Sequence, residues 1–347
     1  MLDVLPVKDP LVDPVAYGRP PSARGDGLAS WGGSILQDPD TSLYHLFAAE
    51  MSGACGLNSW ARNSIIRHAT AKTPLGPFTP RELVLPAFSH EPVVKRLPPS
   101  AGGGYVMWKI GCADKDETGS NGSALSGPCI GCRNGTTSGP CPPPNQATYL
   151  RRCQDALFAR SLSGPWTRHN LSLDAQWDWL HLNSGLESHG PAFLPNGSLL
   201  TFTRSFHDPK PAPTSSVWLV GADAWNGTYR ALASSPAFDV DTEDSFMWID
   251  GRGHFHALFH TWPSEEIVSR GGHAFSADGL NWTYTNAAYN TSVALHGGGL
   301  YAYSRRERPH LLLDGAGNPT ALINGVQPGH DKDWSFTGVF PIRGGRL

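Results

Sequence analysis

Short apolar stretches separated by turn residues run along the whole chain, and two arrangements of them recur. The first arrangement is a small residue, several polar residues, a glycine turn and an aromatic residue, usually beside threonine. It is found at residues 69–79, 159–167, 221–229 and 275–283. Each copy is typical of a strand, a tight turn and a returning strand. The pattern therefore predicts an all-β chain built largely from hairpins.

A second arrangement, a polar pair followed by an apolar run, recurs with a regular period. Its five starts lie at Gly33, Glu91, Gly190, Asp244 and Arg308. Neighbouring starts are 54 to 64 residues apart once the 42 residues of segment 112–153 are set aside. Each interval has room for about four strands, and five such units predict a five-bladed β-propeller. A β-sandwich with chance similarities is the alternative.

The same pattern gives the domain organisation. We expect residues 1–25 to form an N-terminal extension and residues 26–347 to form the propeller. Segment 112–153, rich in cysteine, glycine and proline, is expected to be an insertion in it. No further unit follows the strand-like segment 334–340, so we expect that segment to close the ring onto the first blade.

Composition narrows the classes of partner. The 347 residues carry a formal net charge of −3, and no run of basic residues is present, which argues against a nucleic-acid surface. No stretch approaches the ~18 apolar residues of a membrane span. The 39 glycines and 30 prolines favour short strands and turns over long helices.

Seven asparagines lie in Asn-X-Ser/Thr sequences, which accept N-glycans only in the secretory pathway. Four of the seven precede glycine and also suit hairpin turns. Their number favours a secreted or secretory-pathway glycoprotein. The seven are Asn121, Asn134, Asn170, Asn196, Asn226, Asn281 and Asn290.

Six cysteines agree with an oxidising compartment, and five of them fall within segment 112–153. A segment so rich in glycine and proline cannot build its own core, so disulfides are expected to hold it together. A zinc site using four of its cysteines, including the Cys129-X-X-Cys132 pair, is the alternative. The six are Cys55, Cys112, Cys129, Cys132, Cys141 and Cys153.

The candidate chemistry lies where the innermost strands of the blades begin. These strands line the channel of a propeller, so their first residues meet at one mouth. Cleavage of a glycosidic bond needs one carboxylic acid and one carboxylate, and neighbouring carboxylates help to hold the acid protonated. The candidate catalytic residues are Glu91, Glu243, Asp244 and Glu307.

Other residues at the same mouth are candidates for binding a substrate. Tryptophans can stack on a sugar face, and arginines and histidines can hold hydroxyl or acid groups. The candidates are Trp31, Trp60, His90, His189, Arg306 and Arg308. A purely structural role is the alternative for each, and Glu307 between two arginines also fits a plain salt-bridge cluster.

No cofactor is expected, although a metal ion in the channel is an open alternative. His90 and His189 with a carboxylate could ligate one. His254, His256 and His260 alternate along a predicted strand and share one face. We expect that face to be half exposed rather than a metal site.

The repeated strand starts, together with Ser-Gly-Pro-Trp-Thr (163–167) and Ala-Phe-Ser-Ala-Asp-Gly-Leu-Asn-Trp-Thr (274–283), resemble the five-bladed glycosidases of glycoside hydrolase families 43 and 32. The resemblance covers roughly residues 26–345. It implies a five-bladed propeller and an oligo- or polysaccharide substrate. It also implies an Asp-Pro base or nucleophile in the first blade, a second Asp-Pro and a Glu acid.

The sequence departs from that pattern in two blades. Trp31-Gly32-Gly33-Ser34 stands where the first blade would carry Asp-Pro, and His189-Gly190-Pro191 stands in the third. Only Glu91-Pro92 and Glu243-Asp244 keep acidic residues at the matching places. The sequence therefore predicts either a secreted glycoside hydrolase with displaced carboxylates, or a non-catalytic glycan-binding or cell-wall protein on the same scaffold.

Overall fold

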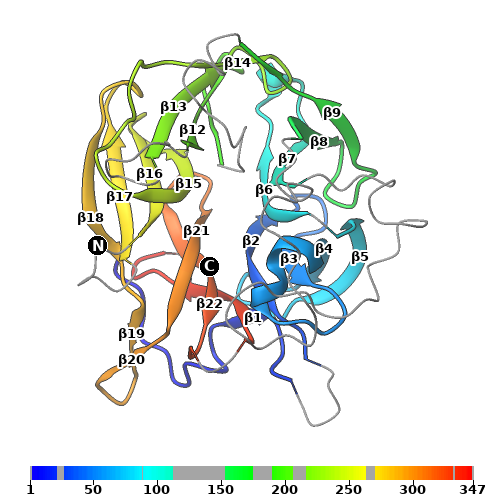
Figure 1. The fold of residues 1–347 in the computed structure, drawn as a ribbon, viewed down its shortest axis with the longest axis vertical. Helices are drawn as coiled ribbons and strands as arrows, with labels where there is room; N and C mark the ends of the chain where they lie inside the picture. Colours follow the sequence, from blue (N-terminus) through cyan, green and yellow to red (C-terminus); the bar gives the residue numbers. More distant parts are fainter. Residues whose placement is uncertain are drawn as a thin grey trace, which may run out of the picture.

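The computed structural model describes residues 2–21, 27–87, 89–111, 153–174, 190–205, 216–262, 270–330 and 333–345. Five small sheets follow one another in chain order around a common centre (Figure 1). This arrangement confirms the predicted five-bladed β-propeller.

The first two blades are antiparallel sheets of four strands each. The first contains β2 (Ser30–Gln37), β3 (Tyr44–Met51), β4 (Ser64–Ala71) and β5 (Thr79–Leu85). The second contains β6 (His90–Arg96), β7 (Tyr105–Ile110), β8 (Asp155–Ala159) and β9 (Thr167–Asn170). Helix α1 (Trp60–Asn63) and two 3-10 turns, Leu57–Ser59 and Pro99–Ala101, connect strands in this part of the chain.

The third and fourth blades follow the same plan. The third contains β11 (Ala192–Phe193), β12 (Leu199–Ser205), β13 (Ser216–Ala222) and β14 (Thr228–Ala231), with β10 (Ser172–Leu173) added parallel to β14. The fourth contains β15 (Thr242–Ile249), β16 (Phe255–Thr261), β17 (Arg270–Ser276) and β18 (Thr283–Tyr289).

The fifth blade is completed by the N-terminal part of the chain. Its strands are β21 (Arg305–Leu313), β22 (Pro319–Gln327), β23 (Phe336–Pro341) and β1 (Val15–Tyr17). A separate hairpin, β19 (Ser292–Ala294) and β20 (Leu300–Ala302), precedes it.

The ring closes differently from the expectation for segment 334–340. Strand β23 does not join the first blade. It lies inside the fifth, between β22 and β1, where Val15 pairs with Gly338. The segment expected to be an extension thus supplies the outer strand of the last blade. Without β1 the backbone groups along one side of β23 would be an unpaired edge, which is the physical reason for this arrangement.

The hydrophobic core of the molecule lies between neighbouring blades. Phe47 of the first blade packs in one cluster with Met107 of the second, and Phe202 of the third packs with Phe259 of the fourth. Leu46 lies in a further cluster with side chains of the fifth blade. Because the inner strands of a blade are covered on both faces, strands such as β13 and β15 are buried along nearly their whole length, whereas the outer strands β5 and β9 are largely exposed.

The sequence features that indicate secretion lie partly outside the described residues. Cys55 and Cys153 are each disulfide-bonded, but the other four cysteines lie outside, so the disulfide-rich insertion stays a prediction. Asn121 and Asn134 lie outside as well. The five other sequon asparagines, Asn170, Asn196, Asn226, Asn281 and Asn290, are all exposed. Within the described residues, no helix is both long and apolar enough to span a membrane.

Candidate functional site

Four of the five inner strands begin with a β-bulge at the same place. The pairing with the second strand of each blade breaks after Ser30, His90, Glu243 and Glu307. A bulge inserts an extra residue and re-aims its side chain out of the regular ladder. The four inner strands are therefore built to direct side chains toward one opening.

Each bulge holds a residue in the left-handed backbone conformation. These residues are Gly32 (φ 66°), Glu91 (φ 54°), Asp244 (φ 57°) and Arg308 (φ 58°). For a residue other than glycine this conformation is strained by roughly 1–2 kcal/mol. Three strained polar residues at equivalent places in three blades are a feature typical of a functional site.

The three polar bulge residues meet in the channel. Nη1 of Arg308 lies 3.0 Å from Oδ1 of Asp244 and also forms an ion pair with Glu91. The same small cavity is lined by all three side chains and by Trp31 and His310. Burial lowers the pKa of Arg308 to about 9. One guanidinium therefore links carboxylates from the second and fourth blades to the fifth.

The first blade leaves room for that guanidinium. A Cβ atom at Gly32 would lie 2.9 Å from Cβ of Arg308. A Cβ atom at Gly33 would lie 2.3 Å from the carbonyl oxygen of Phe47. The two glycines are thus required by close contacts and by positive φ. Arg308 occupies the space beside a blade that contributes no carboxylate here.

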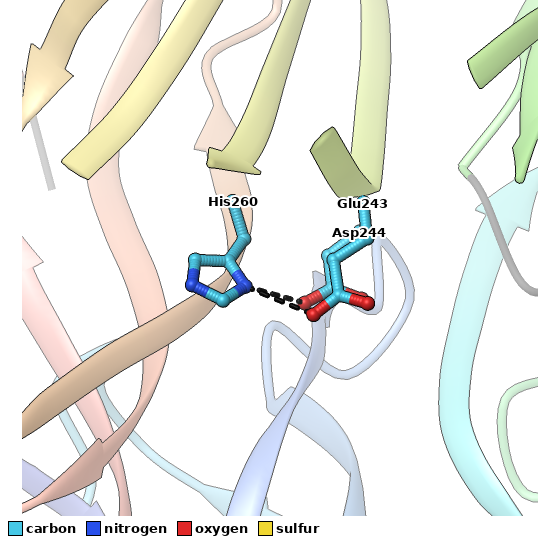
Figure 2. Close-up of side chains that lie close together, drawn as sticks. All are labelled: Glu243, Asp244 and His260. Carbon is cyan, nitrogen blue, oxygen red and sulfur yellow. Dashed lines mark hydrogen bonds and ion pairs between the residues drawn. The ribbon is translucent and has the colours of Figure 1, made fainter. Parts of the chain in front are cut away.

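A second group of charges surrounds His260 beside this channel. Figure 2 shows the His260 ring directed at Glu243 and Asp244, with Nδ1 3.1 Å from Glu243 Oε1 and 3.7 Å from Asp244 Oδ2. Its Nε2 lies 3.7 Å from Oε1 of Glu307. His260 is completely buried. Three of the four predicted catalytic carboxylates therefore surround one imidazole.

Two arginines complete the group. Arg305 donates two hydrogen bonds to Glu307, of 2.7 and 2.6 Å. Arg204, from β12 of the neighbouring blade, forms an ion pair with Glu243. Glu307 and Glu243 are therefore each paired with their own arginine. Asp244 and Glu91, in contrast, share Arg308.

The surroundings separate the pKa values of the buried acids. Burial raises the pKa of Asp244 well above its usual range, and the charges of Glu243 and Glu307 raise it further. Burial also acts to raise the pKa of Glu243, but the hydrogen bond from His260 and the charge of Arg204 outweigh it, and the net shift is downward. The site thus holds an ionised Glu243 next to an Asp244 that retains its proton more readily.

The surroundings also shift the pKa of the His260 imidazole, and here the net shift is upward. Burial acts to lower its pKa, but the charge of Glu307, the hydrogen bond to Glu243 and the charge of Asp244 raise it to about 9. A positively charged His260 at neutral pH follows. It supplies the positive charge that three surrounding acids require.

Three of the predicted binding residues lie next to this site. His90 is buried, with Nδ1 2.6 Å from the hydroxyl oxygen of Ser64. Burial and the nearby charges of Arg308 and Arg305 hold its pKa well below the usual range, so His90 is neutral. The half-buried ring of Trp60 lies 5.2 Å from the His90 ring. The buried ring of Trp31 lies under Arg305.

One other predicted binding residue, Arg306, is not brought to the site. Arg306 is directed away from it: Nε donates to Asn324 Oδ1 and Nη1 donates to the carbonyl of Asn290. Its guanidinium also stacks over the ring of Phe340. These contacts give Arg306 a structural role. His189 lies outside the described residues.

A buried amine, Nζ of Lys95, lies near His310 of the cavity. Nζ of Lys95 lies 3.6 Å above the ring of Phe246 and donates to the carbonyl of Met247. Burial lowers the pKa of Lys95 to about 7. Burial and the charge of Lys95 lower the pKa of nearby His310 to about 3. Phe246 thus packs between Lys95 and His310, and His310 lines the cavity.

Three residues of the site were not predicted: His260, Arg204 and Arg305. The expectation that His260 lies on a half-exposed face is wrong, because packing against the neighbouring blades buries it fully. A signal for it existed, since the tight turn after β15 sets the register that pairs Glu243 with His260. No sequence signal identifies Arg204, because its approach depends on how two blades pack.

One group among the described residues could hold a metal ion. Glu243, Asp244 and His260 each place one ligand atom within 4.8 Å of the others. Oxygen and imidazole donors of this kind suit several divalent cations. An ion there would compete with Arg204 and with the proton on His260. The other proposed set cannot be assembled from the described residues, because it includes His189.

No protein-family model matches the chain, and no curated protein sequence matches it. Several solved structures do match the chain. Zg3597, a family 117 glycoside hydrolase of Zobellia galactanivorans, is 12% identical over 94% of this chain and 88% of its own, with a TM-score of 0.58. The catalytic domain of the Coprinopsis cinerea GH62 α-L-arabinofuranosidase is 10% identical, covers 99% and 98%, and has a TM-score of 0.60.

An endo-arabinase of Bacteroides thetaiotaomicron is 14% identical over 95% of this chain and 99% of its own, with a TM-score of 0.53. Identities this low establish the fold and not the reaction. The chain therefore has the five-bladed propeller scaffold that these glycoside hydrolases share, as the sequence resemblance implied.

Proposed function

We propose that the protein is a secreted glycoside hydrolase that cleaves its substrate at the channel mouth, with Asp244 as general acid and Glu91 as the second carboxylate. The observation that carries this proposal is the pair itself. Two carboxyl groups from different blades are held at strained bulges and contact one arginine. Paired carboxyls in a buried, shaped site are what glycosidic cleavage requires.

Asp244 suits the acid. Burial and two neighbouring carboxylates raise its pKa, so the side chain holds a proton in the pH range where ordinary aspartates have lost theirs. In the reaction that proton passes to the glycosidic oxygen as the bond from the sugar carbon to this oxygen breaks. Glu243 and Glu307 act as fixed charges that keep Asp244 protonated.

Glu91 suits the base or nucleophile. Its carboxylate forms an ion pair with the Arg308 guanidinium. As a base it would take a proton from the attacking water, and as a nucleophile it would bond to the sugar carbon. The separation of the two carboxyls around a bound sugar decides between these courses. The half-buried Trp60, which packs against His90, offers a ring on which a sugar can stack.

Secretion is part of the proposal. The five sequon asparagines of the described residues are exposed, as attachment of glycans requires. Mass spectrometry of protein from a eukaryotic secretory host tests this part, and absence of glycan at all seven sites contradicts it.

The decisive test of the reaction is release of reducing ends from a broad glycan panel, measured by mass spectrometry. We expect Glu91→Gln and Asp244→Asn each to lower release by roughly 100-fold or more, with the folded state checked by thermal unfolding. Asp223→Asn, which alters an exposed ion pair with Arg230, is the matched control. Release that survives both site substitutions contradicts the assignment.

One observation favours a second function. The first blade carries Gly32 where a carboxylate was expected, and Arg308 stands between the two remaining acids. This arrangement also suits a non-catalytic glycan-binding protein. Binding on a glycan array without release of sugar from any of the bound glycans supports that function and excludes hydrolysis.

A further inference from the structure

The guanidinium groups lie between the carboxylates of the site and the solvent. The side chains of Arg308, Arg204 and Arg305 are 15%, 16% and 26% exposed. The carboxylates that they pair with are only 4–8% exposed. A ligand that enters the mouth therefore meets positive charge before it reaches any acid. This order favours a ligand that carries negative charge.

Arg308 is the group best placed to receive such a ligand. It fills the space that Gly32 leaves beside the first blade, and its Nη1 is shared between Glu91 and Asp244. Among the described residues, its buried Nε has no hydrogen-bond acceptor. A planar guanidinium binds a carboxylate through two parallel hydrogen bonds. The present arrangement, with two carboxylates on one nitrogen, leaves that capacity unused.

The unmet groups on the acid side are complementary. Among the described residues, the buried Oδ2 of Asp244 accepts no hydrogen bond. It lies 3.7 Å from Nδ1 of His260, and Oδ1 lies 3.0 Å from Nη1 of Arg308. If a ligand carboxylate takes over Arg308, Asp244 loses part of its positive surroundings. Oδ2 of Asp244 still lies 3.7 Å from Nδ1 of His260, so Asp244 keeps one cationic neighbour. The protein exchanges an internal carboxylate for one from the ligand.

We propose that the site selects glycans that contain a uronic acid, whose carboxylate replaces Asp244 on Arg308. This inference rests on the proposed function, since it names the substrate class of the same site. It assigns Arg308 as the residue that determines specificity. A carboxylate is favoured over a sulfate because the groups that occupy Arg308 in the structure are themselves carboxylates.

The first test is titration calorimetry with oligomers of galacturonate, mannuronate and glucuronate and with the same oligomers after reduction of their carboxyl groups. We expect at least one uronate series to bind about tenfold or more tightly than its reduced form. Arg308→Gln should abolish the preference, and Arg308→Lys should keep only part of it. Arg230→Gln, at an exposed ion pair, is the control and should keep it whole.

The comparison of each uronate with its reduced form on wild-type protein needs no turnover. It therefore tests the inference even if an Arg308 variant does not fold.

The outcomes separate this inference from the proposed function. Equal affinity for acidic and reduced oligomers, stronger binding of a sulfated oligosaccharide without carboxylates, or no binding of any uronate overturns the inference, even if a neutral glycan is hydrolysed. Uronate preference without release of sugar keeps the inference and overturns the hydrolase.

Discussion

At the scale of single residues, the candidate site depends on backbone strain and on one imidazole. Glu91, Asp244 and Arg308 occupy a conformation that glycine would adopt more easily. Their side chains are nevertheless present, and they converge on one cavity. A polar residue retained where glycine is favoured indicates that the side chain has a role beyond stability.

Because of His260, the fold is expected to lose stability as the pH becomes alkaline. Its pKa of about 9 in the folded protein exceeds the ordinary value of 6.5. Its contribution is therefore fully present below pH 6.5 and is lost as the pH rises toward 9. We expect wild type to exceed His260→Gln by roughly 3 kcal/mol in free energy of unfolding at pH 6, with a difference that shrinks toward pH 9.

Denaturant unfolding at several pH values measures this. His296→Gln, at an exposed histidine, is the control and should run parallel to wild type. A constant gap between wild type and His260→Gln from pH 6 to pH 9 would show that folding does not raise the pKa of His260.

At the scale of elements, two blades repeat the same line of side chains. An aspartate follows the inner strand, a histidine is second in the next strand, and another histidine lies diagonally across the third strand. The two imidazoles are 2.8 Å apart in one blade and 3.1 Å in the other. The residues are Asp38, His45 and His68 in the first blade and Asp250, His256 and His273 in the fourth.

These lines make the blades sensitive to acid. Burial, and then the neighbouring His256, lower the pKa of His273 to about 4. Its contribution to stability is present above pH 6.5 and is lost as the pH falls from 6.5 toward 4. We expect His273→Gln to flatten the decline of the thermal unfolding midpoint across this window. An unchanged slope relative to wild type would contradict the shifted pKa.

The elements also show what the sequence can and cannot predict. The period of the strand starts predicted all five blades, because each blade must bury the same two faces and so repeats the same pattern. It also placed Glu91, Asp244 and Arg308 at equivalent points. Arg204 was missed because a contact between strands of different blades leaves no local pattern. His260 was missed because the neighbouring blades bury a strand face that was expected to be half exposed.

At the scale of the whole molecule, the two ends of the chain hold the ring together. Strand β1 covers the edge of β23, and Val4 bridges to Ile342. The hydroxyl of Tyr17 donates a hydrogen bond of 2.5 Å to Glu50 in the first blade. This closure was not predicted, since three residues in β1 are too short a run to stand out as a strand.

Removal of residues 2–17 should therefore destabilise every blade. We expect a fall of several degrees or more in the unfolding midpoint and association through the exposed edge of β23, detected by light scattering. Val12→Ser, at an exposed position, is the control. A truncated chain that stays monomeric with an unchanged midpoint would show that the fifth blade is complete without β1.

The same closure sets an order on synthesis. Strand β1 leaves the ribosome before every other strand described, and its partner β23 leaves after them. The N-terminal strand must therefore wait, unpaired, while more than 300 residues emerge. A contact so distant in sequence forms slowly. Blades that fold early therefore form an incomplete ring until β23 has been synthesised. A factor that shields β1 from other nascent chains during this time would raise the yield of closed rings.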